Sequence, residues 1–350
     1  MMLEGVLVVE GTLLAATLAL FIGHGLWAQW RGTRRRRLLD RGRGLIAAAL
    51  QDSPPLDAAG QRWLASLPVR LQIRLFTDAA RSVTGTQRQR LTELAQAAGL
   101  IARAETRCRS RWWWRRLQGA RLLAALGGGE GSVEPLLQDR NPYVRAQAIE
   151  WAADHPGPAV IAAVLARLND AHGLCRFKAQ DSLVRMAGPV IEPLARYLLA
   201  GGGGSMEAAL RVAVGLAEHR FLIPALTLCR DPSAPVRALV ATLLGKLGGG
   251  QGVEILTVLL ADADAGVRAA AARALGQLGH WPAAPALAVL LKDPAWTARR
   301  EAGLALRAVG APGILFLRRA LTDQDRFAAD MARQVLDLPE AVERAWVQSP

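Results

Sequence analysis

The sequence predicts an all-α protein in which a single N-terminal transmembrane helix precedes a solenoid of about seven to eight stacked helical hairpins. An uncharged apolar run followed by arginines indicates the transmembrane helix, and a repeat of about 31 residues indicates the solenoid. The amino-acid composition also favours α-helices. Ala, Leu and Arg are abundant, and aromatic residues make up only 5% of the 350 residues. These residue types have high intrinsic helix propensity.

The predicted transmembrane helix comes first in the chain. Residues 11–30 contain no Lys, Arg, Asp or Glu, and twenty helical residues span about 30 Å, the thickness of a bilayer core. The alternatives are a signal peptide and a buried core helix. A signal peptide carries its positive charge before the apolar run, whereas here the charge follows it. A core helix of this length would carry a polar face. Residues 1–30 are therefore the predicted anchor.

A cluster of arginines follows the anchor and sets its orientation. Positive residues beside a span stay in the cytoplasm, so we expect residues 31–350 inside the cell and the anchor in the inner membrane. Residues 31–43 form the predicted polybasic juxtamembrane segment, and anionic lipid headgroups are its expected ligands. The residues expected at the membrane surface are Trp27, Trp30, Arg31, Arg34, Arg35, Arg36, Arg37, Arg41 and Arg43.

The positive charge is unevenly distributed. Residues 1–125 hold 20 Lys or Arg and 8 Asp or Glu, which accounts for +12 of the net charge of +13. A basic excess in a soluble protein is typical of nucleic-acid binding. Here it lies beside the predicted anchor, and the rest of the chain is nearly neutral. The pattern favours lipid as the ligand of the basic part and argues against nucleic acid as a partner of the solenoid.

Internal repeats organise the second part of the chain. Successive units begin with an Asp, and an Arg follows six residues later; the units are 31 residues apart, with one gap of 61. The gap has room for a unit that lacks both residues, over 200–229. The five pairs are Asp139 and Arg145, Asp170 and Arg176, Asp231 and Arg237, Asp262 and Arg268, and Asp293 and Arg299.

Each repeat predicts a helical hairpin. The Asp precedes a first helix with a stripe of small apolar residues, which ends at a Gly, and a second helix ends at the next Asp. One hairpin cannot bury its apolar stripe alone, so the hairpins must stack. The Asp accepts hydrogen bonds from free N–H groups at the helix start, and the Arg reaches an Asp of its own or the next unit. We therefore interpret the pairs as a structural ladder.

The units that start at Asp231 and Asp262 resemble HEAT repeats of the bilin-lyase-like kind. The resemblance covers roughly residues 111–338 and implies an α-α superhelix whose second helices line a concave surface that docks other proteins. With the anchor, the chain also resembles bacterial membrane-anchored HEAT proteins of envelope polysaccharide or glycosyltransferase systems. On this basis we expect a membrane-anchored scaffold with a protein partner. A lyase-type HEAT enzyme and a nucleic-acid-binding HEAT-like protein remain the alternatives.

The segment between the anchor and the repeats lacks the repeat pattern. Residues 44–110 are the predicted helical cap, with Thr86 as a helix cap, and residues 111–350 are the predicted solenoid. Of the consecutive tryptophans 112–114, one or two should pack between the cap and the first repeat. The others would face a partner or the membrane interface, because Trp and Arg are enriched at binding hot spots.

Catalytic motifs are not recognisable in the sequence. It contains no His-Glu dipeptide, nucleophile elbow or P-loop, and its three cysteines are dispersed. We expect no enzyme activity, catalytic residue, cofactor or metal. The predicted protein-docking residues are the tryptophan cluster and polar residues of the second helices: Trp112, Trp113, Trp114, Arg167, Glu192, Arg196, Tyr197, Glu254, Arg318 and Arg319.

Overall fold

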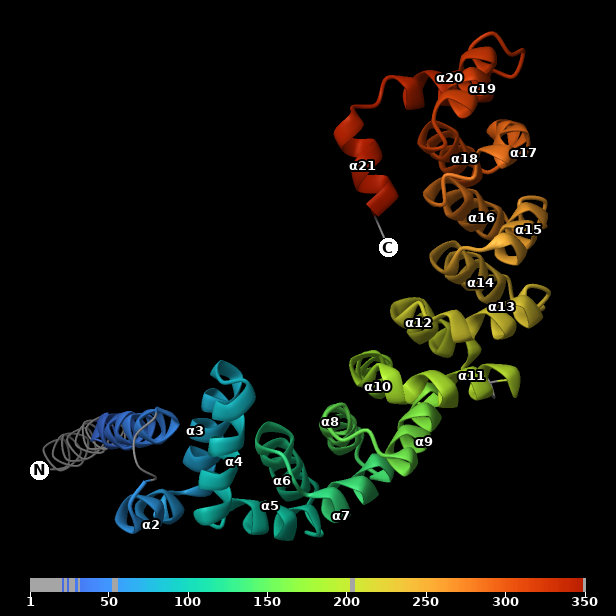
Figure 1. Ribbon diagram of the computed structural model, residues 1–350. Coiled ribbons are helices and arrows are strands. Elements are labelled where there is room, and N and C mark those ends of the chain that lie inside the picture. Colours follow the sequence, from blue (N-terminus) through green and yellow to red (C-terminus); the bar gives the residue numbers. More distant parts are fainter. Residues whose placement is uncertain are drawn as a thin grey trace, which may run out of the picture. The chain divides into compact units, whose positions relative to one another are not determined.

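The computed structural model describes Phe21, His24 and residues 29–30, 32–51, 56–201 and 205–348. All regular elements in this part of the chain are helices (Figure 1). None of the described helices combines the length and the apolarity needed to cross a bilayer. Most of the predicted anchor, including Trp27, lies outside the described residues, as does Arg31, so the transmembrane helix stays a prediction.

The chain divides into two compact units, residues 1–136 and 137–350. The first unit includes a helix over residues 32–50, and it includes α6, which lies within the predicted solenoid range of residues 111–350. α6 belongs to the first unit because it packs on α5 and α3. The helices of this unit after residue 50 are α2 (Ala58–Ser66), α3 (Val69–Ser82), α4 (Gly85–Ala97), α5 (Leu100–Cys108), α6 (Trp113–Leu126) and α7 (Glu130–Val133), followed by η1 (Glu134–Gln138).

The basic segment is part of the helix over residues 32–50. Leu39, Gly42 and Ile46 are buried along one side of this helix. Gly42 lies so close to α3 that an added Cβ would be 2.5 Å from a methyl carbon of Leu75. The membrane-surface arginines that the structure describes (34–37, 41 and 43) are all exposed on this helix. The segment is therefore an amphipathic helix with an arginine-rich outer surface.

The second unit consists of first and second helices in alternation, as the repeat predicts. The unit without Asp and Arg, over residues 200–229, also forms a hairpin. The first helices are α8 (Pro142–Ala152), α10 (Gly173–Met186), α12 (Met206–Leu216), α14 (Ala234–Leu247), α16 (Ala265–Gln277), α18 (Trp296–Ala308) and α20 (Arg326–Leu336). The second helices are α9 (Pro158–Ala166), α11 (Ile191–Leu199), α13 (Leu222–Leu228), α15 (Gly250–Leu259), α17 (Ala284–Val289) and α19 (Ala311–Ala320). The last helix is α21 (Glu340–Gln348).

The second unit curves, and its first helices lie on the inner side of the curve (Figure 1). Glycines allow neighbouring first helices to approach closely: Gly245 faces Ala274, and Gly276 faces Ala305. The second helices lie on the outer side of the curve and approach one another less closely. The expectation that second helices line the concave surface is therefore wrong for this unit, because the small residues bring the first helices together.

The predicted glycine stops are present at four helix ends, whereas the predicted Thr86 cap is wrong. Gly127 follows α6, and Gly248, Gly279 and Gly310 follow first helices. All four have φ between 62° and 83°, the left-handed region in which glycine has no steric penalty. Thr86 is not an N-cap, because α4 already starts at Gly85.

Candidate functional site

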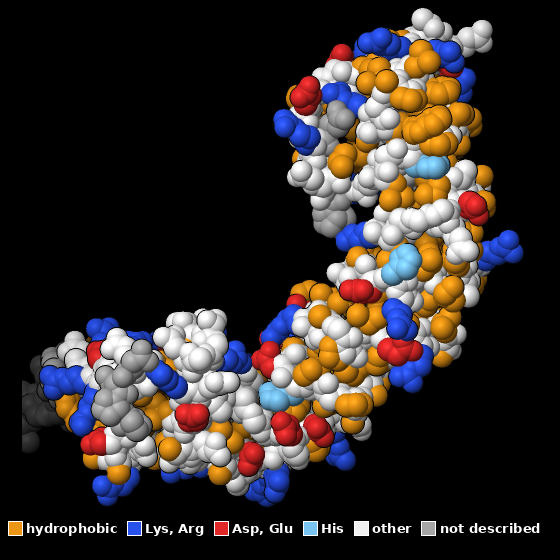
Figure 2. All heavy atoms as spheres, in the orientation of Figure 1, with side chains coloured by type: hydrophobic (Ala, Val, Ile, Leu, Met, Phe, Trp, Pro, Cys, Tyr) orange, Lys and Arg blue, Asp and Glu red, His pale blue; other side chains and the backbone are white. Residues whose placement is uncertain are grey.

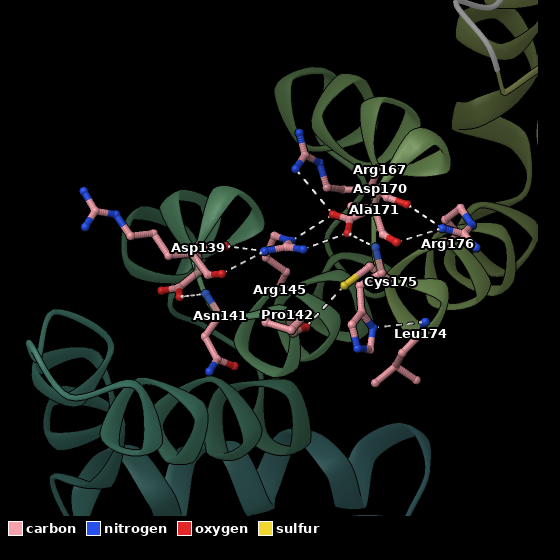
Figure 3. A network of polar contacts seen from close by, with 12 residues as sticks. Asp139, Asn141, Pro142, Arg145, Arg167, Asp170, Ala171, Leu174, Cys175 and Arg176 are labelled. Carbon is pink, nitrogen blue, oxygen red and sulfur yellow. Dashed lines mark hydrogen bonds and ion pairs between the residues drawn. The ribbon is translucent and has the colours of Figure 1, made fainter.

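The Asp–Arg ladder connects neighbouring repeats of the second unit (Figure 3). Arg145 donates from Nε and Nη2 to the two carboxylate oxygens of Asp170 in the next repeat, at 2.8 and 2.7 Å. Its Nη1 donates to the carbonyl oxygen of Asp139 in its own repeat, at 2.8 Å. The planar guanidinium thus binds one carboxylate in a bidentate manner and one loop carbonyl at the same time.

The same arrangement occurs at two further junctions. Arg237 binds Asp262 at 2.7 Å through both nitrogens, and Arg268 binds Asp293 at 2.6 and 2.8 Å. All three carboxylates are largely buried, with side-chain exposures of 2 to 10%. Removing one partner of such a buried pair leaves an uncompensated charge, which makes the ladder a structural feature with a large energetic effect.

The ladder Asp is not the helix N-cap. Its carboxylate accepts the backbone N–H of the residue two positions later, as in Asp262 and Asp264 at 2.8 Å. That second residue is the N-cap, and Asn141, His172 and Asp264 cap their helices with side-chain hydrogen bonds. The Asp therefore fixes the loop that presents the cap, one step before the helix start.

The ladder makes stability depend on pH. The hydrogen bond from Arg237 holds the pKa of Asp262 below its ordinary value. A lowered folded-state pKa contributes stability above the unfolded-state pKa, and this contribution is lost as the pH falls through the folded-state value. We expect the melting temperature of the full chain to fall as the pH is lowered below about 4. Asp262→Asn should weaken this dependence, and an unchanged slope in the variant would contradict the assignment.

Two arginines of the ladder lack the carboxylate partner. Arg176 donates Nη1 to the carbonyl oxygens of Asp170 and Ala171, but no described carboxylate meets its other nitrogens. Arg299 lies over the ring of Phe327, with 5.0 Å between Cζ and the ring centroid. The Asp that follows Arg299, Asp323, pairs instead with Lys292.

The second helices carry a row of exposed aliphatic side chains, which we name the aliphatic stripe. It consists of Ile223, Val258, Val289 and Leu315, with exposures of 49 to 71%. Each lies eight or four residues before the next Asp, and positions four apart share one helix face. Figure 2 shows apolar side chains along the second-helix side of the unit. Contiguous exposed apolar surface marks interaction sites in soluble domains.

Three of the predicted docking residues of the second helices share a helix face with the stripe: Glu254 is four residues before Val258, and Arg318 and Arg319 are three and four residues after Leu315. Glu192 and Arg196 are exposed on α11. The other two have structural contacts. Arg167 pairs with Asp170 at 3.5 Å, and the hydroxyl of Tyr197 is 2.5 Å from Oγ of Ser205.

The tryptophan cluster is exposed on the first turn of α6 and just before it. Trp112, Trp113 and Trp114 have exposures of 40 to 42%, so the expectation that one or two are buried between cap and repeat is wrong. They contact one another instead, with 4.7 Å between the rings of Trp112 and Trp114. Arg111 covers the ring of Trp112 at 4.6 Å. The cluster stays a prediction as a docking surface within the first unit.

The C-terminal helix α21 lies against the first helices α16 and α18. Trp346 is buried there, and its Nε1 donates to Glu301 at 2.9 Å. Glu301 also accepts two hydrogen bonds from Arg273, at 3.0 and 3.2 Å. Trp346 therefore holds α21 in two ways: its ring is buried, and its indole N–H donates a hydrogen bond to a carboxylate. Part of the inner surface is therefore covered by the chain itself.

Trp346→Ala should release α21. The substitution removes the buried ring and its hydrogen bond, and truncation of a buried Trp costs about 3 to 5 kcal/mol where the surroundings cannot collapse. Hydrogen exchange should show that the amides of residues 340–348 lose protection, whereas α10 and α12 keep theirs. Retained protection of α21 would show that Trp346 does not hold it.

In the described part of the chain, no group of three or more His, Cys, Asp or Glu side chains is placed to bind a metal ion. The cysteines are free. Burial is the main cause that raises the pKa of the Cys108 thiol to about 12, so it stays protonated at neutral pH. A protonated buried thiol is a poor nucleophile.

The stacked hairpins, the ladder and the glycine stops have a counterpart among known families. The family described as HEAT repeats matches residues 220–307 and again residues 253–337. Residues 220–337 contain HEAT repeats. None of the curated proteins compared with the chain matches.

Solved structures place the chain among helical solenoids. Importin beta is 12% identical, with a TM-score of 0.53, over 83% of this chain and 46% of that one. The CpcE–CpcF complex of phycocyanin lyase from Nostoc is 18% identical over 68% and 93% of the chains, with a TM-score of 0.32. Human deoxyhypusine hydroxylase is 19% identical over 73% and 100%, with a TM-score of 0.29. At these identities the likeness to importin beta shows the fold alone.

Proposed function

We propose that the protein is a scaffold that docks another protein on the aliphatic stripe and the charged residues beside it. The stripe is the observation that carries the proposal, because each of four neighbouring second helices carries an exposed aliphatic side chain. Helical solenoids of the HEAT kind are typical protein-binding frameworks, since stacking leaves extended surfaces that are free of core packing.

The charge beside the stripe favours a protein partner over nucleic acid. Glu254, Arg318 and Arg319 supply both signs, and the chain beyond residue 125 is nearly neutral. A nucleic-acid surface needs clustered Lys and Arg that neutralise phosphates. An apolar centre with a mixed polar rim is typical of a protein interface.

Membrane attachment completes the proposal. The uncharged run over residues 11–30 would anchor the scaffold in the inner membrane, with the repeats in the cytoplasm and the exposed arginines of residues 32–50 against anionic headgroups. Tethering raises the local concentration of a docked partner near membrane proteins without new contacts. Removal of residues 1–30 should move the protein from the membrane to the soluble fraction, and an unchanged distribution would contradict the anchor.

Co-purification from membranes tests the docking surface. The full chain with Val258→Asn and Val289→Asn should lose the partners that the unaltered protein recovers. Asp181→Asn with Lys246→Asn is the matched control, because both residues are exposed on first helices and the net charge is unchanged. Equal partner recovery by the stripe variant, or recovery of lipid alone, would contradict protein docking on the stripe.

A further inference from the structure

The ladder is interrupted at the repeat over residues 200–229, which lies within the second unit. Between Ala200 and Ser205 the chain contains only glycines, so this junction supplies no acid. In the same unit the position of the ladder Arg, four residues after the N-cap, is the buried Ala209. Arg176 therefore receives no carboxylate from the next repeat, and Asp231 receives no guanidinium from the previous one, among the residues that the structure describes.

Arg176 and Asp231, the two ladder residues without a described ladder partner at this interruption, line the same hollow. It has a volume of about 660 Å³ and lies among the starts of α10, α12 and α14, and Arg176, Gln180, Ser205, Glu207, Arg211 and Asp231 contribute to its wall. Arg176 is held in place there, because its Nη1 donates to the carbonyl oxygens of Asp170 at 2.7 Å and Ala171 at 3.1 Å. Arg211 differs from it, because Arg211 has Glu207 at 3.9 Å on its own helix.

The intact junctions show which ligand fits Arg176. Where an Arg of the ladder is complete, Nη1 binds the loop carbonyls and Nε and Nη2 bind one carboxylate at 2.6 to 2.8 Å. Arg176 uses Nη1 in this way and leaves Nε and Nη2 for a ligand. A guanidinium fork of this geometry selects a planar carboxylate.

We propose that Arg176 binds the carboxylate of an acidic side chain of the docked protein, which takes the place of the missing ladder Asp. The inference rests on the proposed docking function and specifies the chemistry of the partner. Asp231 and Glu207 on the same wall disfavour a run of acids and favour a segment in which a single Asp or Glu lies near a Lys or Arg.

The experiment uses the full chain in detergent and a short capped peptide that contains one Asp and one Arg. Calorimetric titration should show binding that weakens at least tenfold when the peptide Asp is replaced by Asn. The same loss should follow Arg176→Gln. Arg176→Lys should also bind weakly, because it keeps a positive charge but lacks the fork. Arg220→Gln is the matched control, since Arg220 is exposed outside the hollow.

Several outcomes would overturn the proposal. These are equal binding of the Asp and Asn peptides, unchanged binding by Arg176→Gln, or equally tight binding of free glutarate, which would indicate a site for small carboxylates. Thermal unfolding of Arg176→Gln checks that the variant is folded, and Arg176→Lys repeats the test if it is not. Loss of partner recovery by the stripe variant alone, with peptide binding independent of Arg176, would reject this inference and keep the docking function.

Discussion

Asp262→Ala should lower the free energy of unfolding by about 3 kcal/mol. Its carboxylate accepts both nitrogens of the Arg237 fork at 2.7 Å and the N–H of Asp264 at 2.8 Å. The side chains of Asp262 and Arg237 are only 10% and 15% exposed. The substitution leaves a largely buried guanidinium without its counter-charge and frees the loop that presents the next helix cap.

Denaturant unfolding of the full chain in detergent measures this effect. Asp330→Ala is the matched control, because Asp330 is exposed and pairs with Arg333 on its own helix, with exposures of 57% and 59%. An exposed pair of this kind contributes about 0 to 1 kcal/mol. If the two variants lose the same stability, the ladder is not the framework that joins the repeats.

Gly276→Ala should destabilise the protein by about 2 kcal/mol, because overpacked cores lose 1 to 3 kcal/mol. The added Cβ would lie 2.6 Å from Cα of Ala305 and 2.8 Å from Cη2 of Trp346. Both distances are shorter than van der Waals contact, so α16 and α18 must separate and α21 must shift. The variant thus tests whether a glycine contact sets the close approach of the first helices.

Gly250→Ala is the control for this effect. No atom lies within 4 Å of a Cβ at Gly250, on the first turn of α15. Gly→Ala at a compatible position stabilises by about 0.4 to 1 kcal/mol. Equal stability of the two variants would mean that α16 and α18 can move apart freely.

The repeat made the fold predictable from the sequence. Regular Asp and Arg spacing with Gly stops defines hairpins, and their stacking follows because one hairpin cannot bury its own stripe. The intact ladder contacts followed from the same spacing. The direction of curvature did not, because it depends on pairs such as Gly276 and Ala305, which lie on different helices and come together only in the folded array.

The sequence predicts the proposed docking surface only in part. Arg196 and Glu254 stand out as polar residues on apolar helices, whereas the aliphatic stripe does not stand out from the apolar residues around it. Val258 and Val289 each lie four residues before an Asp, and this shared position is the only sequence pattern that marks them. An apolar residue on an apolar helix cannot be distinguished from a core residue by its type. The place of Trp346 was also hidden, because its partner Glu301 is 45 residues away.

Site-specific photo-crosslinking in cells tests most directly whether a protein docks on the aliphatic stripe. A photoreactive amino acid would replace Val258 on the stripe or Lys246 on a first helix, both of which are exposed. We expect a discrete protein adduct from position 258, which is lost when Val289→Asn is added, and no such adduct from position 246. Adducts from position 246 alone, or only lipid adducts from position 258, would contradict protein docking on the second helices.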